Sequence, residues 1–206
     1  MTPEKPSTEI PDAYHAGSRQ LQDRFDSRRI ADRLEQVTAH TTFNDHDRAF
    51  IDASPMFFLA TADQEGWPDC SYKGGIPGFV RVTDEHSLAF PDYDGNGMFR
   101  SLGNISVNPH VGLLFINFEK PARLRVNGVA TLHTDDPLLS EFAGAQLIVR
   151  VYAERIFPNC PRYIHTMQMV KYSIYAPTSG HTPPEPDWKQ QPEFRDALPK
   201  RGPSLP

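Results

Sequence analysis

The chain has 206 residues, with 21 lysines and arginines against 26 aspartates and glutamates, and a formal net charge of −5. An acidic chain of this size argues against a nucleic-acid binder that depends on phosphate contacts. Its longest uninterrupted apolar stretches, such as residues 56–60, span about five residues, far short of a membrane-spanning helix. The first residues have no apolar signal-peptide core. We therefore expect a soluble cytoplasmic protein that acts on neither nucleic acid nor membrane.

Proline marks both ends of the chain, because 11 of its 20 prolines lie in residues 1–11 and 176–206. We expect a flexible N-terminal segment over residues 1–17. Residues 177–206 should form an extended tail with polyproline character, or a strap over another subunit. Helices packed on the following domain are predicted over 18–53: one over 18–38, with an apolar stripe, and one over 45–53, capped by Asn44 or Asp45.

From Met56 onward the hydrophobic period changes to that of strands. Strands are predicted over 56–61, from Trp67 onward, and over 79–82, 87–90, 111–118, 122–132, 147–157 and 169–175. A helix is expected over 96–107, stopped by Asn108-Pro109, with a short one over 136–143. Seven or eight strands joined by short turns favour an antiparallel barrel or sandwich.

Three segments combine residue types that bind anions. Residues 69–75, Asp-Cys-Ser-Tyr-Lys-Gly-Gly, offer a hydroxyl, a cation and glycines that let a ligand approach the backbone. Residues 90–101 form a glycine-rich turn that enters a helix with Arg100 and Ser101 in its first turns, which suits a phosphate. Residues 122–128 place two arginines on one face of a strand. Each segment alone could be an ordinary turn or a solvated surface, but their combination in this order is more specific.

The order of these segments is similar to that of the pyridoxamine 5′-phosphate oxidase-like flavoprotein superfamily. The likeness covers about residues 54–176 and is most specific in the succession SLAFPDYDGNGMFRSLGNI, NPHVGLLFI and RLRVNGVA. Ser71-Tyr72-Lys73-Gly74 before PGFVRV matches one branch of the family. The resemblance implies an α+β, mainly β fold: an antiparallel split β-barrel over residues 54–176 with peripheral helices. It also implies a homodimer with FMN in a groove at its interface.

The resemblance further assigns FMN contacts to residues of this chain. The phosphate-binding cation falls on Arg100, and Lys73 would hold the phosphate or the ribityl chain. The strand under the isoalloxazine ring falls on residues 80–82. The complete set of implied cofactor contacts is Ser71, Lys73, Val80, Arg81, Val82, Pro91, Asp92, Asn96, Arg100, Ser101 and Arg123.

The chain departs from the oxidase proper in two places, which leaves its small-molecule substrate open. It has Arg100-Ser101 where the oxidase has an Arg-Lys pair, and a Pro-rich tail replaces the oxidase's C-terminal substrate segment. Arg162 and His165 are candidates to contact a substrate anion, although their segment could equally be a strand end stapled by prolines. No residue is assigned as catalytic.

An FMN-dependent oxidoreductase is therefore the leading functional hypothesis. The alternative is a non-catalytic flavin- or haem-binding protein of the same fold. Cys70 and Cys160 are 90 positions apart and fit neither a disulfide framework nor a paired metal motif. The histidines lack ligand spacing as well, so no metal site is expected.

Overall fold

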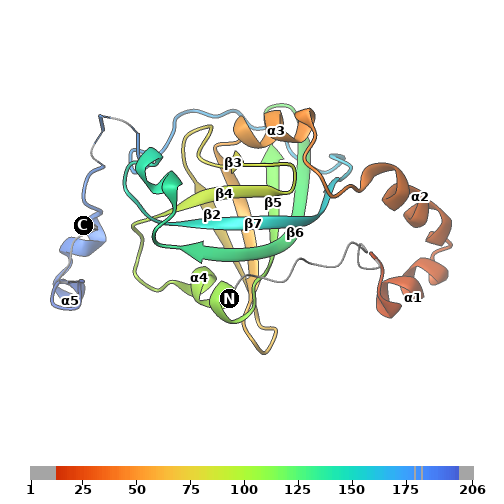
Figure 1. Cartoon of the computed structure of the whole chain (residues 1–206), viewed down its shortest axis with the longest axis horizontal. Helices are drawn as coiled ribbons and strands as arrows, with labels where there is room; N and C mark the ends of the chain where they lie inside the picture. Colours follow the sequence, from red (N-terminus) through yellow and green to blue (C-terminus); the bar gives the residue numbers. More distant parts are fainter. Residues whose placement is uncertain (1–12, 179, 182, 200–206) are drawn as a thin grey trace.

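The computed structural model describes residues 13–178, 180–181 and 183–199. Its seven strands form one sheet in the order β2-β1-β5-β6-β7-β4-β3, in which all neighbouring strands are antiparallel (Figure 1). The strands are β1 (Met56–Ala62), β2 (Pro68–Gly74), β3 (Arg81–Val82), β4 (Ser87–Tyr93), β5 (His110–Asn117), β6 (Ala122–His133) and β7 (Ala145–Pro158). The predicted α+β, mainly antiparallel β architecture is confirmed.

Helices surround this sheet. They are α1 (Ala16–Arg24), α2 (Arg28–Thr38), α3 (Asp45–Asp52), α4 (Arg100–Val107) and α5 (Pro192–Arg195), with 3-10 turns η1 (Pro137–Glu141) and η2 (Asp187–Gln190). Within the described part of the chain, none of them has both the length and the apolar character to cross a bilayer.

An aromatic cluster forms the centre of the core. The ring centroid of Phe57 lies 5.0 Å from that of Phe90 and 5.1 Å from that of Phe115, and all three side chains are almost completely buried. These residues come from β1, β4 and β5; alternate side chains are buried along β5, whereas four consecutive residues of β4 are buried. Edge-to-face and tilted pairs of this kind add to the stabilisation from burial.

Two helices close the barrel and position the loops near the site. Asn44 is the N-cap of helix α3, and its side chain accepts a hydrogen bond from the Asp47 N–H in a capping box. The sequence predicted a cap at Asn44 or Asp45. Helix α3 buries Ile51 completely. Helix α4 buries Leu102 and Ile105 against β1, β2 and β6. This packing fixes the start of α4 beside β2.

The helix predicted over 18–38 is two helices, so that prediction is wrong. The chain reverses at Asp26, which has a φ of 49°, a left-handed conformation that aspartate tolerates better than most residues. Helices α1 and α2 bury no residues, and they stand away from the sheet on the side opposite the C-terminal segment (Figure 1). Their predicted apolar stripe is exposed in this chain: Leu21, Phe25, Ile30, Leu34 and Val37.

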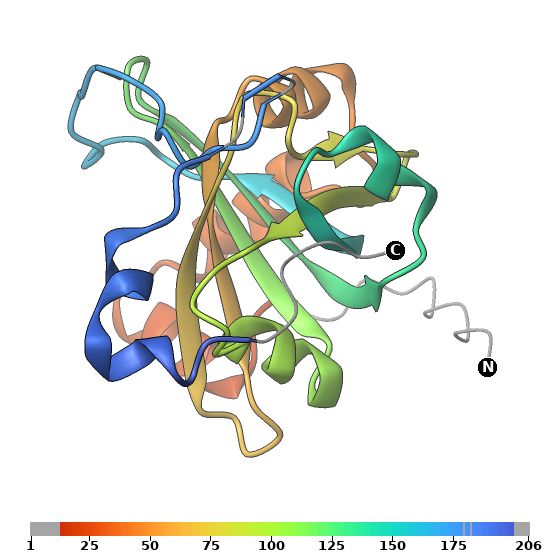
Figure 2. The same ribbon diagram turned by 90° about the vertical axis from the view of Figure 1, so that its left-hand side faces the viewer.

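Three further predictions are corrected. No strand forms over 169–175, because that segment runs exposed and pairs with no strand in the described residues. The helix predicted from residue 96 begins at Arg100, after a turn. The tail predicted as extended contains η2 and α5 (Figure 2). Residues 1–12 of the expected N-terminal segment lie outside the described residues, as do positions 179, 182 and 200–206 of the tail.

Candidate functional site

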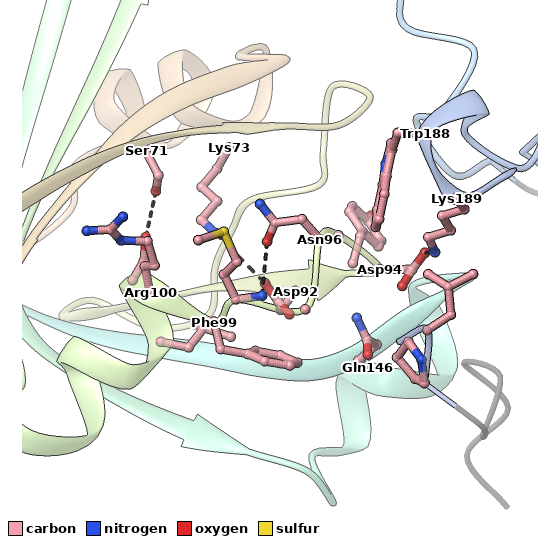
Figure 3. A pocket seen from close by; sticks show the side chains of 18 of the residues that line it. Ser71, Lys73, Asp92, Asp94, Asn96, Phe99, Arg100, Gln146, Trp188 and Lys189 are labelled. Carbon is pink, nitrogen blue, oxygen red and sulfur yellow. Dashed lines mark hydrogen bonds and ion pairs between the residues drawn. The ribbon is translucent and has the colours of Figure 1, made fainter. Parts of the chain in front are cut away.

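An open groove of about 1010 Å³ is lined by β2, the turn after β4, the start of α4 and the C-terminal segment. Ser71 and Arg100 lie at one end of it, and Trp188 and Lys189 at the other, with Lys73 between them (Figure 3). The groove therefore has one end rich in hydrogen-bond donors and one end with an aromatic wall.

Strand β2 supplies three polar side chains because they alternate along it. Asp69, Ser71 and Lys73 are half-buried and line the groove, whereas Cys70 is exposed and does not line it; the exposed Tyr72 borders the groove as well. Successive side chains of a strand point to opposite faces, so every second residue of this segment reaches the same wall. The spacing Asp-x-Ser-x-Lys is thus the sequence signal for this side of the groove.

The turn between β4 and α4 shapes the donor-rich end. Gly97 has a φ of 74°, and Phe99 has a φ of 48°, which is uncommon for a bulky residue. The Asn96 side-chain oxygen accepts a hydrogen bond from the Met98 N–H at 3.0 Å. Helix α4 then begins at Arg100 without a side-chain cap. Its first N–H groups are consequently available to an anion in the groove.

Ser101 joins α4 to β2. Its side chain is almost completely buried, and its hydroxyl oxygen lies 3.0 Å from Asp69 Oδ2 and 2.9 Å from Ser71 Oγ. A hydroxyl has one proton to donate and a carboxylate only accepts, so Ser101 donates to Asp69 and accepts from Ser71. These bonds hold the wall formed by β2 at a fixed position relative to the helix start.

Most charges in the groove are paired. Lys73 Nζ lies 3.8 Å from Asp92 Oδ1, and Lys189 forms an ion pair with Asp94. Burial raises the pKa of Asp92 above its ordinary value; Lys73 opposes this shift and Asp94 reinforces it. Arg100 is exposed and forms no ion pair within the described residues, so its guanidinium can meet a ligand.

Burial also raises the pKa of Tyr93 to about 12, with Arg81 acting in the opposite direction. The phenol is therefore neutral at any physiological pH. It lines the groove next to Asp92 as a hydrogen-bonding group, not as an anion.

A family model described as pyridoxamine 5′-phosphate oxidase matches residues 43–171, which is more than half of the chain. The chain belongs to this family. The match covers all seven strands, α4 and the donor-rich end of the groove, and with the observed sheet it identifies the split-barrel fold. It stops before Trp188 and Lys189, so the aromatic end of the groove in this oxidase-family member comes from outside the matched range.

Several solved structures resemble this oxidase-family chain at low identity. HupZ of Group A Streptococcus is 19% identical with a TM-score of 0.46, over 56% of this chain and 93% of that chain. General Stress Protein 26 of Bacillus anthracis is 15% identical with a TM-score of 0.43, over 53% and 88%. HutZ, the heme storage protein of Vibrio cholerae, is 20% identical with a TM-score of 0.38, over 56% and 89%. No curated protein sequence matches the chain.

The groove brings together about half of the cofactor contacts predicted for this member of the oxidase family. The predicted residues that line it are Ser71, Lys73, Asp92, Asn96, Arg100 and Ser101. They come from β2, the end of β4, the following turn and the start of α4. Their roles in binding FMN stay predictions, but the structure places these residues, which are up to 30 positions apart in the sequence, around one groove.

Four other predicted contacts belong to the β3–β4 hairpin and do not line the groove: Val80, Arg81, Val82 and Pro91. Val80 is completely buried in the core. Arg81 forms an ion pair with Glu141, and its guanidinium carbon lies 4.5 Å from the ring centroid of Phe142. Arg81 is thus already engaged with the segment between β6 and β7.

Arg123 lies in a second groove, of about 410 Å³, which shares no lining residue with the first. One terminal nitrogen of its guanidinium donates to the Cys160 carbonyl at 2.9 Å. Its Nε is buried and has no hydrogen-bond partner among the described residues. The half-buried His40 and the buried Asp47 line the same space, with His40 Nε2 2.7 Å from Asp47 Oδ2.

Arg162 and His165 are exposed in the segment that follows β7, and they line neither groove. Their proposed contact with a substrate stays a prediction. Sequence reasoning missed other residues that line the first groove, among them Tyr93, Asp94, Gln146, Trp188, Lys189 and Phe194. The available signal was the pair of aromatic residues in an otherwise polar tail, since such side chains normally pack on a surface.

Proposed function

We propose that the chain binds FMN in the first groove and acts as an FMN-dependent oxidoreductase on a small molecule. The observation that carries this proposal is the convergence of Ser71, Lys73 and Arg100 at the uncapped start of α4. A phosphate monoester gains charge-assisted hydrogen bonds from such cations and favourable interaction with a helix N-terminus. The family supports the same assignment.

The residues present fit this cofactor. Asp69 accepts the hydrogen bond of Ser101, which engages one of its oxygens within the protein. The Asp92 carboxylate has Lys73 Nζ 3.8 Å from its Oδ1, so a cation offsets its negative charge near a bound phosphate. One compact set of donors, with no GxGxxG segment for a pyrophosphate, favours FMN over FAD.

Bound FMN would supply the electron-transfer chemistry that protein side chains lack. The chain's own part is to hold the phosphate through the cations of Lys73 and Arg100, and to keep the neutral Tyr93 hydroxyl beside the ligand. On ligand binding, Lys73 would exchange part of its interaction with Asp92 for an interaction with the phosphate. It can do so because Lys73 Nζ and Asp92 Oδ1 are 3.8 Å apart and not in tight contact.

Cofactor identity and ligand titration test the proposal. We expect chromatography of the cofactor released from purified protein to show FMN. Apo-protein should bind FMN about 10- to 150-fold more tightly than riboflavin, which lacks the phosphate, since one hydrogen bond to a charged group is worth roughly 1.5–3 kcal/mol. Released FAD, or equal affinities for FMN and riboflavin, would contradict the phosphate assignment.

Catalysis requires a separate measurement. An oxidoreductase should lose its yellow colour under anaerobic NAD(P)H or a reduced substrate, whereas a non-catalytic carrier would stay oxidised with every reductant in a screen. Haem is the competing ligand, and its iron is normally held by histidine, cysteine, methionine or tyrosine. Among the described residues, the groove lining contains no histidine or cysteine, and of these ligand types it offers only Tyr72, Tyr93 and Met98, so the case for the flavin rests on the phosphate-binding end of the groove.

We also propose that the chain is a homodimer. The exposed apolar side chains of α1 and α2 support this, as does the exposed segment 163–175, in which Tyr163 and Val170 are 86% and 90% accessible. Large apolar side chains gathered on exposed elements often mark an interface. Light scattering at low micromolar concentration should give twice the 23.3 kDa mass of the chain, and a monomeric mass would refute it.

A further inference from the structure

The aromatic end of the groove is formed by residues 185–199, here named the C-terminal strap. It contains η2 and α5 and runs beside β2 towards α4 (Figure 2). Trp188, Lys189 and Phe194 of the strap line the groove together with the polar residues of β2 and α4. The strap therefore belongs to the same cavity although it is more than 80 positions from Arg100.

Side-chain contacts hold the strap in place. Lys189 forms its ion pair with Asp94 in the turn that precedes α4, and the side chain of Lys189 is only 17% exposed. The rings of Trp188 and Phe194 pack edge to face, with centroids 6.0 Å apart at 77°. Lys189 Nζ also lies 5.8 Å from the Trp188 ring. These contacts fix the indole at the groove end opposite Arg100 (Figure 3).

The position of Trp188 matches the needs of a long ligand with two different ends. Its ring is half-buried and lines the cavity, so part of its apolar surface is open to whatever occupies the groove. An indole offers a large flat face, and planar rings gain free energy when they stack on it. A ligand with its anionic group at Arg100 would extend along Lys73 and place the remainder of the molecule near this face.

We propose that Trp188 is a ligand-contact residue that binds the planar ring system of the flavin, and that the strap thereby sets specificity for the ring end of the ligand. This inference rests on the proposed function. It assigns separate tasks to the two ends: Arg100 recognises the phosphate, and Trp188 recognises the ring.

A comparison of FMN with riboflavin separates these tasks, because both ligands have the ring and only FMN has the phosphate. Trp188→Ala should weaken the binding of both ligands by the same factor, roughly 5- to 150-fold, the range measured when a stacked base loses its aromatic partner. Arg100→Ala should weaken FMN and leave riboflavin unchanged. Trp188→Phe should retain most of the affinity for both ligands.

The matched control is Trp67→Phe, since Trp67 is the only other tryptophan of the chain, is 72% exposed and does not line the groove. This variant should bind both flavins as wild type does. If Trp188→Ala fails to fold, Trp188→Leu keeps an apolar side chain, removes the ring and is expected to give the same loss.

Wild-type affinity of the folded Trp188 variants for both ligands would overturn the inference and leave the FMN proposal standing. A loss confined to FMN would also overturn it, because Trp188 would then act at the phosphate. If wild-type protein binds neither ligand, the proposed function itself fails. A changed visible absorption band of bound flavin in Trp188→Phe, absent in Trp67→Phe, would support direct ring contact.

Discussion

Replacement of Arg100 by alanine tests the phosphate end of the groove most directly. Arg100 is the first residue of α4, is exposed, and forms no ion pair among the described residues, so its removal leaves no charged partner uncompensated in the folded chain. A hydrogen bond to a charged group contributes roughly 1.5–3 kcal/mol. At about 1.4 kcal/mol per decade, the FMN dissociation constant should rise about 10- to 150-fold.

Isothermal titration of apo-protein with FMN at low and high salt measures this change. Because the guanidinium is exposed, screening should reduce the difference between wild type and variant as salt rises. The control is Arg33→Ala on the exposed face of α2, which should bind FMN normally. Both variants should unfold within about 0.5 kcal/mol of wild type in the absence of cofactor. Unchanged FMN affinity in a folded Arg100→Ala protein would remove Arg100 from the site.

Two further predictions concern the fold that supports the groove. The carboxylate of Asp136, almost completely buried, accepts two hydrogen bonds from Arg150 at 2.6 and 3.0 Å, and this pairing holds its pKa below the ordinary value. Asp136→Asn should therefore lower the free energy of unfolding by roughly 1.5–3 kcal/mol at pH 7. The wild-type advantage should disappear as the pH falls below about 4 and the carboxylate is protonated. The control Asp135→Asn, at an exposed position, should change the free energy of unfolding little. A difference between wild type and Asp136→Asn in urea denaturation that does not depend on pH would contradict this prediction. Gly128→Ala should destabilise by about 3 kcal/mol or more, because its Cβ would lie 2.0 Å from the Tyr152 carbonyl oxygen. Gly103→Ala, in helix α4 with open space around it, should instead stabilise by up to about 1 kcal/mol, and thermal melting of the two variants should give shifts of opposite sign.

Local signals predicted the elements that depend on neighbouring residues. The helix cap, predicted at Asn44 or Asp45 and found at Asn44, and the apolar strands β5 and β6 are encoded within a few positions, and the structure has them near the predicted bounds. The break at Asp26 was missed because apolar residues continue at helical spacing across it. Nothing in the local pattern shows that the chain reverses there.

The candidate site likewise has one part that local sequence predicted and one part that it did not. Its donor-rich end comes from two short segments, residues 69–73 and 92–101, whose composition alone indicated an anion site. Its aromatic end depends on a contact between Lys189 and Asp94, which are 95 positions apart, and such a contact leaves no local periodicity. The position of Arg123 in the second groove could not be predicted either. Strand alternation indicates which face of the sheet a side chain is on, but not which residues of other elements lie against that face.

Substitutions at the two ends of the groove differ in how strongly they affect folding. Ser101 is buried between α4 and β2, so most replacements there would disturb the barrel as well as the ligand. No residue of the C-terminal strap is buried, and exposed positions usually tolerate substitution with little change in the free energy of unfolding. Mutation can thus diversify the ring end while the phosphate end and the barrel stay constant. For protein engineering, the strap is the segment in which a randomised library would sample new ligands with the fewest unfolded members.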